Sequence, residues 1–294
     1  MEFIFEILKS VIYGVIQGIT EWLPISSTGH LILLNTVLPL NVFNDAAKNI
    51  AFWDMYKVVI QFGSILAVAL IYFEKLNPFS SKKNKIEKES TWNLWIKIIV
   101  ATIPAGIAGV LLDDFIDAKF STPVVVAVAL IVYGVLFIIM KNVGKTKVTS
   151  VKNMDYLTAF KIGCFQMLAL IPGTSRSGST ILGSTLVGCS RTTATEFSFF
   201  MAIPVMLGAS ILKLIKMQAP FTLAAAVILL VGMFVAFIVS VIVIRSFLKY
   251  IRKHDFKVFG IYRIILGILI LILALTKVLP TGLVAWYKIA VRYF

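Results

Sequence analysis

Two polar stretches interrupt a chain that is otherwise strongly apolar, and the first lies at residues 17–30. It carries a carboxamide at Gln17, a carboxylate at Glu21, four hydroxyl side chains and an imidazole. Gln17 and Glu21 are four residues apart, so a helix would place both side chains on one face. Pro24 predicts the end of that helix, because a proline disfavours the α conformation of the residue before it.

The hydroxyl groups and the imidazole that follow this proline are the parts of nucleophilic catalysis. Ser26, Ser27 and Thr28 would present hydroxyl and free backbone N–H groups where a second helix begins. His30 lies three residues after Ser27, so it could act as a base beside a serine nucleophile while Glu21 orients that base. The same residues would also suit a structural arrangement in which the serines cap the helix and His30 is an interior histidine.

The second polar stretch, residues 172–180, has the composition of an anion site. Pro172 and Gly173 predict a break in the chain, and Arg176 supplies a permanent cation whose planar fork suits phosphate oxygens. An arginine that only capped a helix would be costly in lipid, where an ionised side chain costs about 3 kcal/mol. A helix start with an arginine therefore predicts phosphate binding. The hydroxyl residues expected to contact the phosphate are Thr174, Ser175, Ser177 and Thr180, with Ser26 and Thr28 from the first stretch.

A divalent cation at this place would be held by oxygen ligands. Glu21 is the carboxylate of the first stretch, and Gln17 could add a carbonyl oxygen. Mg²⁺ or Ca²⁺ would then bridge Glu21 and substrate phosphates, as hard cations commonly do. The cysteines and histidines of the chain form no cluster with the spacing of a transition-metal site.

The remaining sequence must hold these stretches inside a membrane. Of the 294 residues, 59% are hydrophobic and 14% are charged. Soluble domains are about half apolar and about a quarter charged, so the composition predicts an all-α polytopic membrane protein. The formal net charge of +14 is expected to serve topology and contacts with anionic membrane lipids, and no nucleic-acid partner is expected.

The apolar segments follow a repeating order. Residues 5–38 and 157–189 contain the two polar stretches, and each predicts a re-entrant hairpin of two helices around a break. The other apolar segments predict transmembrane helices at roughly 56–74, 93–112, 122–140, 197–215, 222–244 and 258–277. Each hairpin precedes three spans, which predicts a single membrane domain, 1–294, with internal repeats of approximately 1–150 and 151–294.

Three crossings in each repeat would turn the second repeat upside down relative to the first. Gly14-x-x-Gln17 and Gly163-x-x-Gln166 stand at matching places before the two breaks, which supports a duplication. The expected architecture is an inverted repeat whose broken helices meet near the midplane of the membrane.

Charge between the spans predicts the orientation in the membrane. Lysine and arginine concentrate in segments 75–92, 141–161 and 245–257, whereas the loop expected at 113–119 holds three aspartates and one lysine. The positive-inside rule places the basic segments in the cytoplasm and the acidic segment, with both termini, outside.

The motif residues resemble a known family. Gln17-x-x-x-Glu21 and Pro172-Gly173-x-Ser175-Arg176-Ser177-x-x-Thr180 resemble the two signature motifs of the undecaprenyl-diphosphate phosphatases, also called bacitracin-resistance proteins. Segments 23–30 and 196–199 are similar to that family as well, and the resemblance covers nearly the whole chain. The first signature position is Glu or Gln in the family, and Gln17 here removes one charge from the expected metal site.

This resemblance implies a bacterial plasma (inner) membrane enzyme. It would hydrolyse undecaprenyl diphosphate to the monophosphate and phosphate at the outer face, recycle the lipid carrier of cell-wall synthesis and confer bacitracin resistance. It also implies a dependence on a divalent metal, an inverted-repeat fold and a homodimer. By motif position, the active residues would be Glu21, Ser27, His30, Ser175, Arg176 and Thr180.

The expected roles leave two versions of the chemistry open. Arg176 and nearby N–H groups would hold the diphosphate while a metal on Glu21 screens its charge. Ser27 would attack the terminal phosphorus with His30 as base, or His30 would attack directly. A secondary transporter or flippase for a phosphorylated lipid or anion is the alternative function, because inverted repeats with broken helices are typical of transporters.

Overall fold

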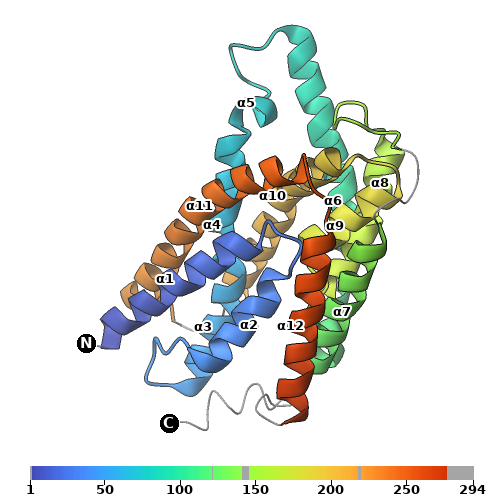
Figure 1. Cartoon of the computed structure of the whole chain (residues 1–294). Helices are drawn as coiled ribbons and strands as arrows, with labels where there is room; N and C mark the ends of the chain where they lie inside the picture. The colour runs from blue at the N-terminus through green and yellow to red at the C-terminus, as the bar shows by residue number, and fades with distance from the viewer. Residues whose placement is uncertain (1, 121, 141–145, 218–219, 277–294) are drawn as a thin grey trace.

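The computed structural model describes all residues except 1, 121, 141–145, 218–219 and 277–294, and its regular structure is helical (Figure 1). Helices α1 (Glu2–Thr20) and α2 (Ser27–Val37) flank the first polar stretch. Helix α8 (Tyr156–Met167), the 3₁₀ turn η2 (Leu168–Leu170) and α9 (Arg176–Leu186) surround the second. The other helices are α3 (Ala46–Val59), α4 (Gln61–Ile71), α5 (Phe73–Leu76), α6 (Lys85–Phe120), α7 (Pro123–Ile139), α10 (Arg191–Ile215), α11 (Leu223–Ile251) and α12 (Lys257–Leu275). The predicted all-α class is confirmed.

Both interrupted segments fold as hairpins. In the first, the Tyr13 hydroxyl donates to the Leu38 carbonyl over 2.8 Å, so the end of α2 lies beside the middle of α1 (Figure 1). In the second, the Lys147 N–H donates to the Gly188 carbonyl over 2.8 Å, so the chain entering α8 lies beside the chain leaving α9. Each hairpin therefore enters and leaves on one side of the protein.

Each hairpin packs along a different long helix. Helix α1 runs parallel to α11, because the Ser10 hydroxyl donates to the Ile228 carbonyl over 2.6 Å and Gly18 lies against Val239 and the Ala236 carbonyl. The second hairpin's α8 arm runs parallel to α6, because Gly163 lies directly against the Ala101 carbonyl and Leu170 lies beside Gly109. A methyl group at Gly18 or Gly163 would collide with the partner helix, so glycine allows this close approach.

The membrane-crossing helices differ in detail from the expectation. Six helical segments among the described residues are long and apolar enough to cross a membrane. They are Glu2–Thr20, Ala46–Ile71 (α3 and α4 together), Lys85–Leu112 (most of α6), Arg191–Ile215, Leu223–Ile251 and Lys257–Leu275. The first of these lies in a predicted hairpin, whereas the predicted span 122–140 corresponds to the shorter Pro123–Ile139. The end of the predicted span at 277 and part of the basic segment 141–161, including Lys141 and Lys145, lie outside the described residues.

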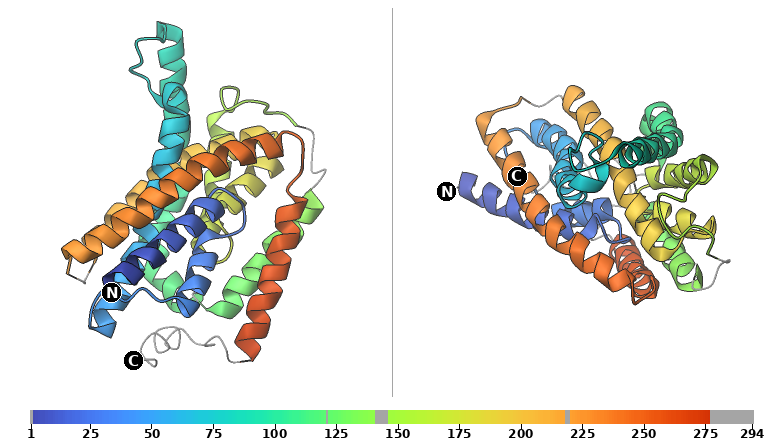
Figure 2. Two further views of the ribbon diagram at one scale, coloured as in Figure 1. Left: turned by 60° about the vertical axis from the view of Figure 1, so that its left-hand side comes forward. Right: turned by 90° about the horizontal axis from the view of Figure 1, so that it is seen from above.

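Several helices continue past the ends that hydropathy predicts. Helix α10 begins at Arg191 because the Ser190 hydroxyl caps it by accepting the Thr193 N–H. The acidic segment 113–119, predicted as a loop, belongs to α6. The hydrogen bonds of a helix can continue past its apolar segment, whereas hydropathy identifies only the apolar segment. Figure 2 shows α5 and the start of α6 projecting beyond the other helices.

An aromatic core lies beside the two breaks. Trp22, at the end of the first hairpin's α1 arm, is completely buried, and its ring meets that of Phe199 edge-on with centroids 5.0 Å apart. Phe197 and Phe200 of α10 are buried in the same cluster. These side chains fix the position of the first break against α10.

Candidate functional site

Each helix break contains a serine in an unusual backbone conformation. Ser26 and Ser175 both have φ of 73°, in the left-handed region that residues other than glycine rarely adopt. Each serine caps the following helix, with its hydroxyl oxygen accepting the N–H of Gly29 (3.3 Å) or Gly178 (3.2 Å). Ser26 is thus the structural counterpart of Ser175. Such strain persists only where the surrounding structure enforces it, and it concentrates at functional sites.

The two breaks bring oppositely charged side chains together. Arg176 Nη2 lies 3.3 Å from Glu21 Oε1, although the residues are far apart in the chain. The Ser27 hydroxyl donates to Glu21 Oε2 over 2.6 Å, and Gln17 Nε2 donates to the same oxygen over 3.1 Å. Glu21 is buried, and these three donors take the place of water in stabilising its carboxylate. The prediction that the two polar stretches meet is confirmed.

Arg176 is held by more than its ion pair with Glu21. Its Nη1 donates to the Ser198 carbonyl of α10 over 2.8 Å, and its guanidinium lies 6.0 Å from the centre of the Trp22 ring. Its Nε has no hydrogen-bond partner among the described residues. The guanidinium is therefore fixed by a carbonyl, a carboxylate and an aromatic face.

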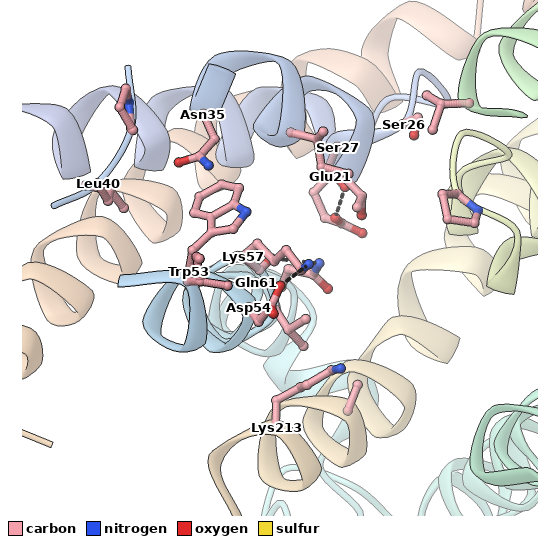
Figure 3. A pocket seen from close by; sticks show the side chains of 18 of the residues that line it. Glu21, Ser26, Ser27, Asn35, Leu40, Trp53, Asp54, Lys57, Gln61 and Lys213 are labelled. Atoms are coloured by element: carbon pink, nitrogen blue, oxygen red, sulfur yellow. Dashed lines mark hydrogen bonds and ion pairs between the residues drawn. The ribbon is translucent and has the colours of Figure 1, made fainter. Parts of the chain in front are cut away.

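A cavity of about 1090 Å³ contains this cluster (Figure 3). Figure 3 shows Asp54, Lys57 and Gln61 across the cavity from Glu21 and Ser27. Lys57 pairs with Asp54 over 2.6 Å. The cavity walls also include apolar residues of α6, α7 and α10, such as Ala105, Val126 and Val205. The site thus combines charged groups with an apolar wall.

The predicted site residues divide into two groups. Those that line the cavity are Glu21, Ser26, Ser27, Thr28, Ser175 and Arg176. Glu21 follows the end of α1, whereas the other five stand at the starts of α2 and α9, where backbone N–H groups have no acceptor within their own helix. This set can bind an anion and presents one hydroxyl, that of Ser27, directly to a carboxylate.

Three predicted phosphate-binding hydroxyls instead hold the protein together. The Ser177 hydroxyl donates to the carbonyls of Glu21 and Leu23 at 3.1 and 3.2 Å, which joins the two hairpins. Thr180 Oγ1 lies 2.6 Å from the Ser198 hydroxyl, and Thr174 Oγ1 donates to two carbonyls of its own loop. None of the three belongs to the cavity lining found among the described residues.

His30 points away from Ser27 and Glu21. Its Nδ1 lies 2.8 Å from the Ser26 carbonyl, and its Nε2 lies 2.6 Å from the Tyr262 hydroxyl of α12. A carbonyl can only accept, so Nδ1 carries a hydrogen. The side chain leans toward the start of α2, as helical side chains do, and therefore reaches the carbonyl one turn back. In this geometry Glu21, not His30, is in hydrogen-bond contact with the Ser27 hydroxyl.

The residues around Glu21 offer part of a site for a divalent cation. Among the described residues no group of three or more His, Cys, Asp or Glu could hold a metal ion. Glu21 provides one carboxylate, and Gln17 Oε1 is buried without a hydrogen-bond partner in the described part of the chain. These are the hard oxygen donors that Mg²⁺ and Ca²⁺ prefer, and substrate phosphates commonly complete such a site.

Two residues near the site were missed by the sequence analysis. Arg263 is completely buried in α12, and its neighbour Tyr262 contacts His30. The signal for Arg263 was present, because it is an ionised side chain inside the apolar segment 258–277. Tyr262 gave no signal, since tyrosine is common in transmembrane helices near the interface.

Comparisons with known proteins agree with the geometry. The profile of the family described as bacitracin resistance protein BacA matches residues 10–269. "Undecaprenyl-diphosphatase 1" of Clostridioides difficile (strain 630) is 55% identical over 267 residues, covering 90% of this chain and 95% of the relative. "Undecaprenyl-diphosphatase" of Latilactobacillus sakei subsp. sakei (strain 23K) is 53% identical over 272 residues, covering 90% and 97%. "Undecaprenyl-diphosphatase" of Enterococcus faecalis is 51% identical over 273 residues, covering 91% and 97%. This multi-pass membrane protein therefore belongs to the bacitracin resistance protein BacA family.

Proposed function

We propose that this protein hydrolyses undecaprenyl diphosphate to undecaprenyl phosphate and phosphate. The observation that carries the proposal is the contact of Ser27 with Glu21, beside Arg176, in a cavity between membrane helices. A hydroxyl, a proton acceptor and a fixed cation are what a phosphatase site requires. The relatives named above carry the same activity in their names, which supports the choice of substrate.

Arg176 and the free N–H groups at the starts of α2 and α9 bind the terminal phosphate. They supply positive potential where negative charge must be held, and they are fixed before the substrate arrives. The hydroxyls of Ser26, Thr28 and Ser175, which line the cavity, add hydrogen bonds to the phosphate oxygens. The apolar walls contact the first part of the prenyl chain.

Ser27 is the nucleophile in the proposed reaction. Its oxygen forms a bond to the terminal phosphorus, and its proton passes to Glu21 Oε2, 2.6 Å away. The bond from that phosphorus to the bridging oxygen breaks, and undecaprenyl phosphate leaves with the electron pair. Water then attacks the phosphoserine, and the serine oxygen takes back a proton as phosphate is released. The two hydrogen bonds of His30 give it a supporting role in which it holds the Ser26 carbonyl.

A divalent cation fits this proposal. Glu21 and Gln17 Oε1 would hold Mg²⁺ or Ca²⁺ together with phosphate oxygens of the substrate. When bound, the ion neutralises part of the charge of the diphosphate. Arg176 and the helix starts then act on the remaining charge.

The proposed orientation has the cavity open to the outer face of the plasma membrane. Support comes from the basic segments 75–92 and 245–257, which the positive-inside rule places in the cytoplasm.

The packing of the helices supports an inverted repeat. Helix α1 packs on α11 in the same way as α8 packs on α6, and α4 contacts α11 in the same way as α10 contacts α6. A homodimer is proposed from the family resemblance, and crosslinking in native membranes tests it.

The decisive experiment measures phosphate release from a C55 prenyl diphosphate by the purified protein in detergent. The wild type is expected to turn over, whereas Arg176→Ala and chelator-treated protein are expected to lose activity. Arg252→Ala, at the cytoplasmic end of α11, is the matched control and should remain active. Binding of the lipid without phosphate release by the wild type would contradict the proposal and favour a transporter or flippase.

A further inference from the structure

Arg263 is a buried cation that contacts backbone carbonyls from three parts of the chain. Its side chain is completely inaccessible, and no carboxylate of the described residues pairs with it. Its Nη1 donates to the Pro24 carbonyl over 2.9 Å. Its Nη2 donates to the carbonyls of Gly173 and Thr174 over 2.8 and 3.0 Å. Longer contacts of 3.4 and 3.5 Å reach two carbonyls of α7.

The three close contacts belong to the two helix breaks. Pro24 lies two residues before the strained Ser26, and Gly173 and Thr174 immediately precede the strained Ser175. One guanidinium therefore holds both breaks by their backbones. We propose that Arg263 is a positioning residue for the phosphatase reaction, because it fixes the distance between the breaks that carry Ser27 and Arg176. This inference rests on the function proposed above.

The direction of the carbonyls explains how Arg263 acts on the cavity. In a trans peptide the C=O and the following N–H point in opposite directions. With the Thr174 carbonyl directed at Arg263, the N–H of Ser175 points away from Arg263, and Ser175 lines the cavity. A hydrogen bond to the carbonyl also polarises the peptide and makes its N–H a better donor. Arg263 thereby orients and strengthens a donor for the phosphate without touching it.

The packing of α12 fixes Arg263 where both breaks are within reach. A methyl group on Gly260 would lie 2.6 Å from the Gly134 carbonyl, and one on Gly267 would lie 2.8 Å from the Ala127 carbonyl. The backbones of α12 and α7 are therefore in direct contact above and below Arg263. The guanidinium also lies 5.3 Å from the centre of the Tyr133 ring of α7, which holds it in place.

The planar fork of arginine is essential to this role. Two of its nitrogens reach carbonyls on different hairpins at once, whereas a lysine is a single point of charge. Arg263→Lys therefore keeps the charge but loses the rigid fork that ties the two breaks to each other, so both breaks are held less firmly. A misplacement of about 1 Å can reduce a rate by about 10²-fold, so we expect kcat to fall by about that factor while KM changes little.

The test compares Arg263→Lys with Ile270→Ala. Ile270 is buried on the same helix in an apolar cluster with residues of α7, and its side chain has no polar atom to bind a break, so its truncation disturbs apolar packing alone. Both variants are assayed for phosphate release from a C55 prenyl diphosphate, well below their unfolding temperatures. Amide hydrogen exchange is measured in parallel over residues 23–28 and 172–178. Arg263→Lys should lose kcat and exchange faster at both breaks, and Ile270→Ala should do neither.

Several results would overturn the inference. Wild-type kcat in Arg263→Lys would do so, as would faster exchange at only one break or equal effects in both variants. If Arg263→Lys does not fold, Tyr133→Leu takes its place, because it removes the supporting ring and leaves Arg263 present. Unchanged kcat and unchanged exchange in Tyr133→Leu would then overturn the inference. An inactive wild type would refute the proposed phosphatase instead, and the exchange measurement would still report on Arg263.

Discussion

Glu21→Gln is the substitution that tests the proposed proton acceptor most directly. The change keeps the size of the side chain and an acceptor oxygen, but it removes the negative charge. The Ser27 hydroxyl would then lack a proton acceptor, because Glu21 Oε2 is the group 2.6 Å from its oxygen. His30 cannot replace Glu21 without leaving both its hydrogen bonds, to the Ser26 carbonyl and the Tyr262 hydroxyl.

The expected loss follows from the size of general-base catalysis. A positioned base contributes about 10²- to 10⁴-fold, so kcat should fall by that factor. At about 1.36 kcal/mol for each tenfold, this corresponds to about 3–5 kcal/mol of transition-state stabilisation. Removing one partner of a buried ion pair outright costs about 3–5 kcal/mol of the free energy of unfolding, and Glu21→Gln should cost less than this. The reason is that Arg176 keeps the Ser198 carbonyl at 2.8 Å and the new amide still offers an oxygen.

The assay is phosphate release from a C55 prenyl diphosphate, with kcat and KM determined separately and unfolding followed by intrinsic fluorescence. Glu196→Gln is the matched control, because Glu196 also forms an ion pair, with Lys75 over 2.7 Å. Glu196 is outside the cavity lining among the described residues, so its variant should keep wild-type kcat. A Glu21→Gln protein that turns over like the wild type would refute the assignment of Glu21 as the proton acceptor.

Three further outcomes are expected. Ser27→Ala should lower kcat by about 10²-fold or more and should form no phosphoenzyme when substrate with a radiolabelled terminal phosphate is added. Radiolabel on the Ser27→Ala protein would point to another nucleophile. Chelation should stop turnover, and Gln17→Leu should raise the Mg²⁺ concentration needed to restore it; an unchanged requirement would remove Gln17 from the metal site. The Thr158 N–H lowers the pKa of the exposed Asp155, which caps the start of α8. This stabilisation is therefore present above about pH 4 and is lost as the pH falls further. The difference in unfolding temperature between wild type and Asp155→Ala should therefore shrink below about pH 4, and a constant difference would contradict the reasoning.

The parts of the site that could be predicted from sequence depend on local signals. Pro24 and Pro172 mark the breaks because proline restricts the residues around it, whatever the fold. Glu21 and Arg176 stood out because an ionised side chain in an apolar chain must pair or face water. Both signals act within a few residues, and the structure confirms the two hairpins and the meeting of the two polar stretches.

The parts that could not be predicted depend on distant partners. The ring of His30 is directed by Tyr262, which lies 232 residues away in the chain. Thr180 and Ser177 had the composition of phosphate ligands, yet their hydroxyls meet Ser198 and the carbonyl of Glu21. A spacing pattern cannot show which of several hydroxyls faces a cavity, because that choice is made by the packing of the other hairpin.

The length of α7 has a consequence for the surrounding lipid. Its 17 residues span about 26 Å at about 1.5 Å each, whereas the hydrocarbon layer is about 30 Å thick. The acyl chains beside α7 must therefore compress or the helix must shift toward one leaflet, and each ångström of such mismatch has an energetic cost. Thr122 and Val126 at the start of α7 border the cavity, so a thinner lipid layer beside α7 would bring headgroups closer to the cavity. Turnover in vesicles should accordingly depend on the acyl-chain length of the host lipid.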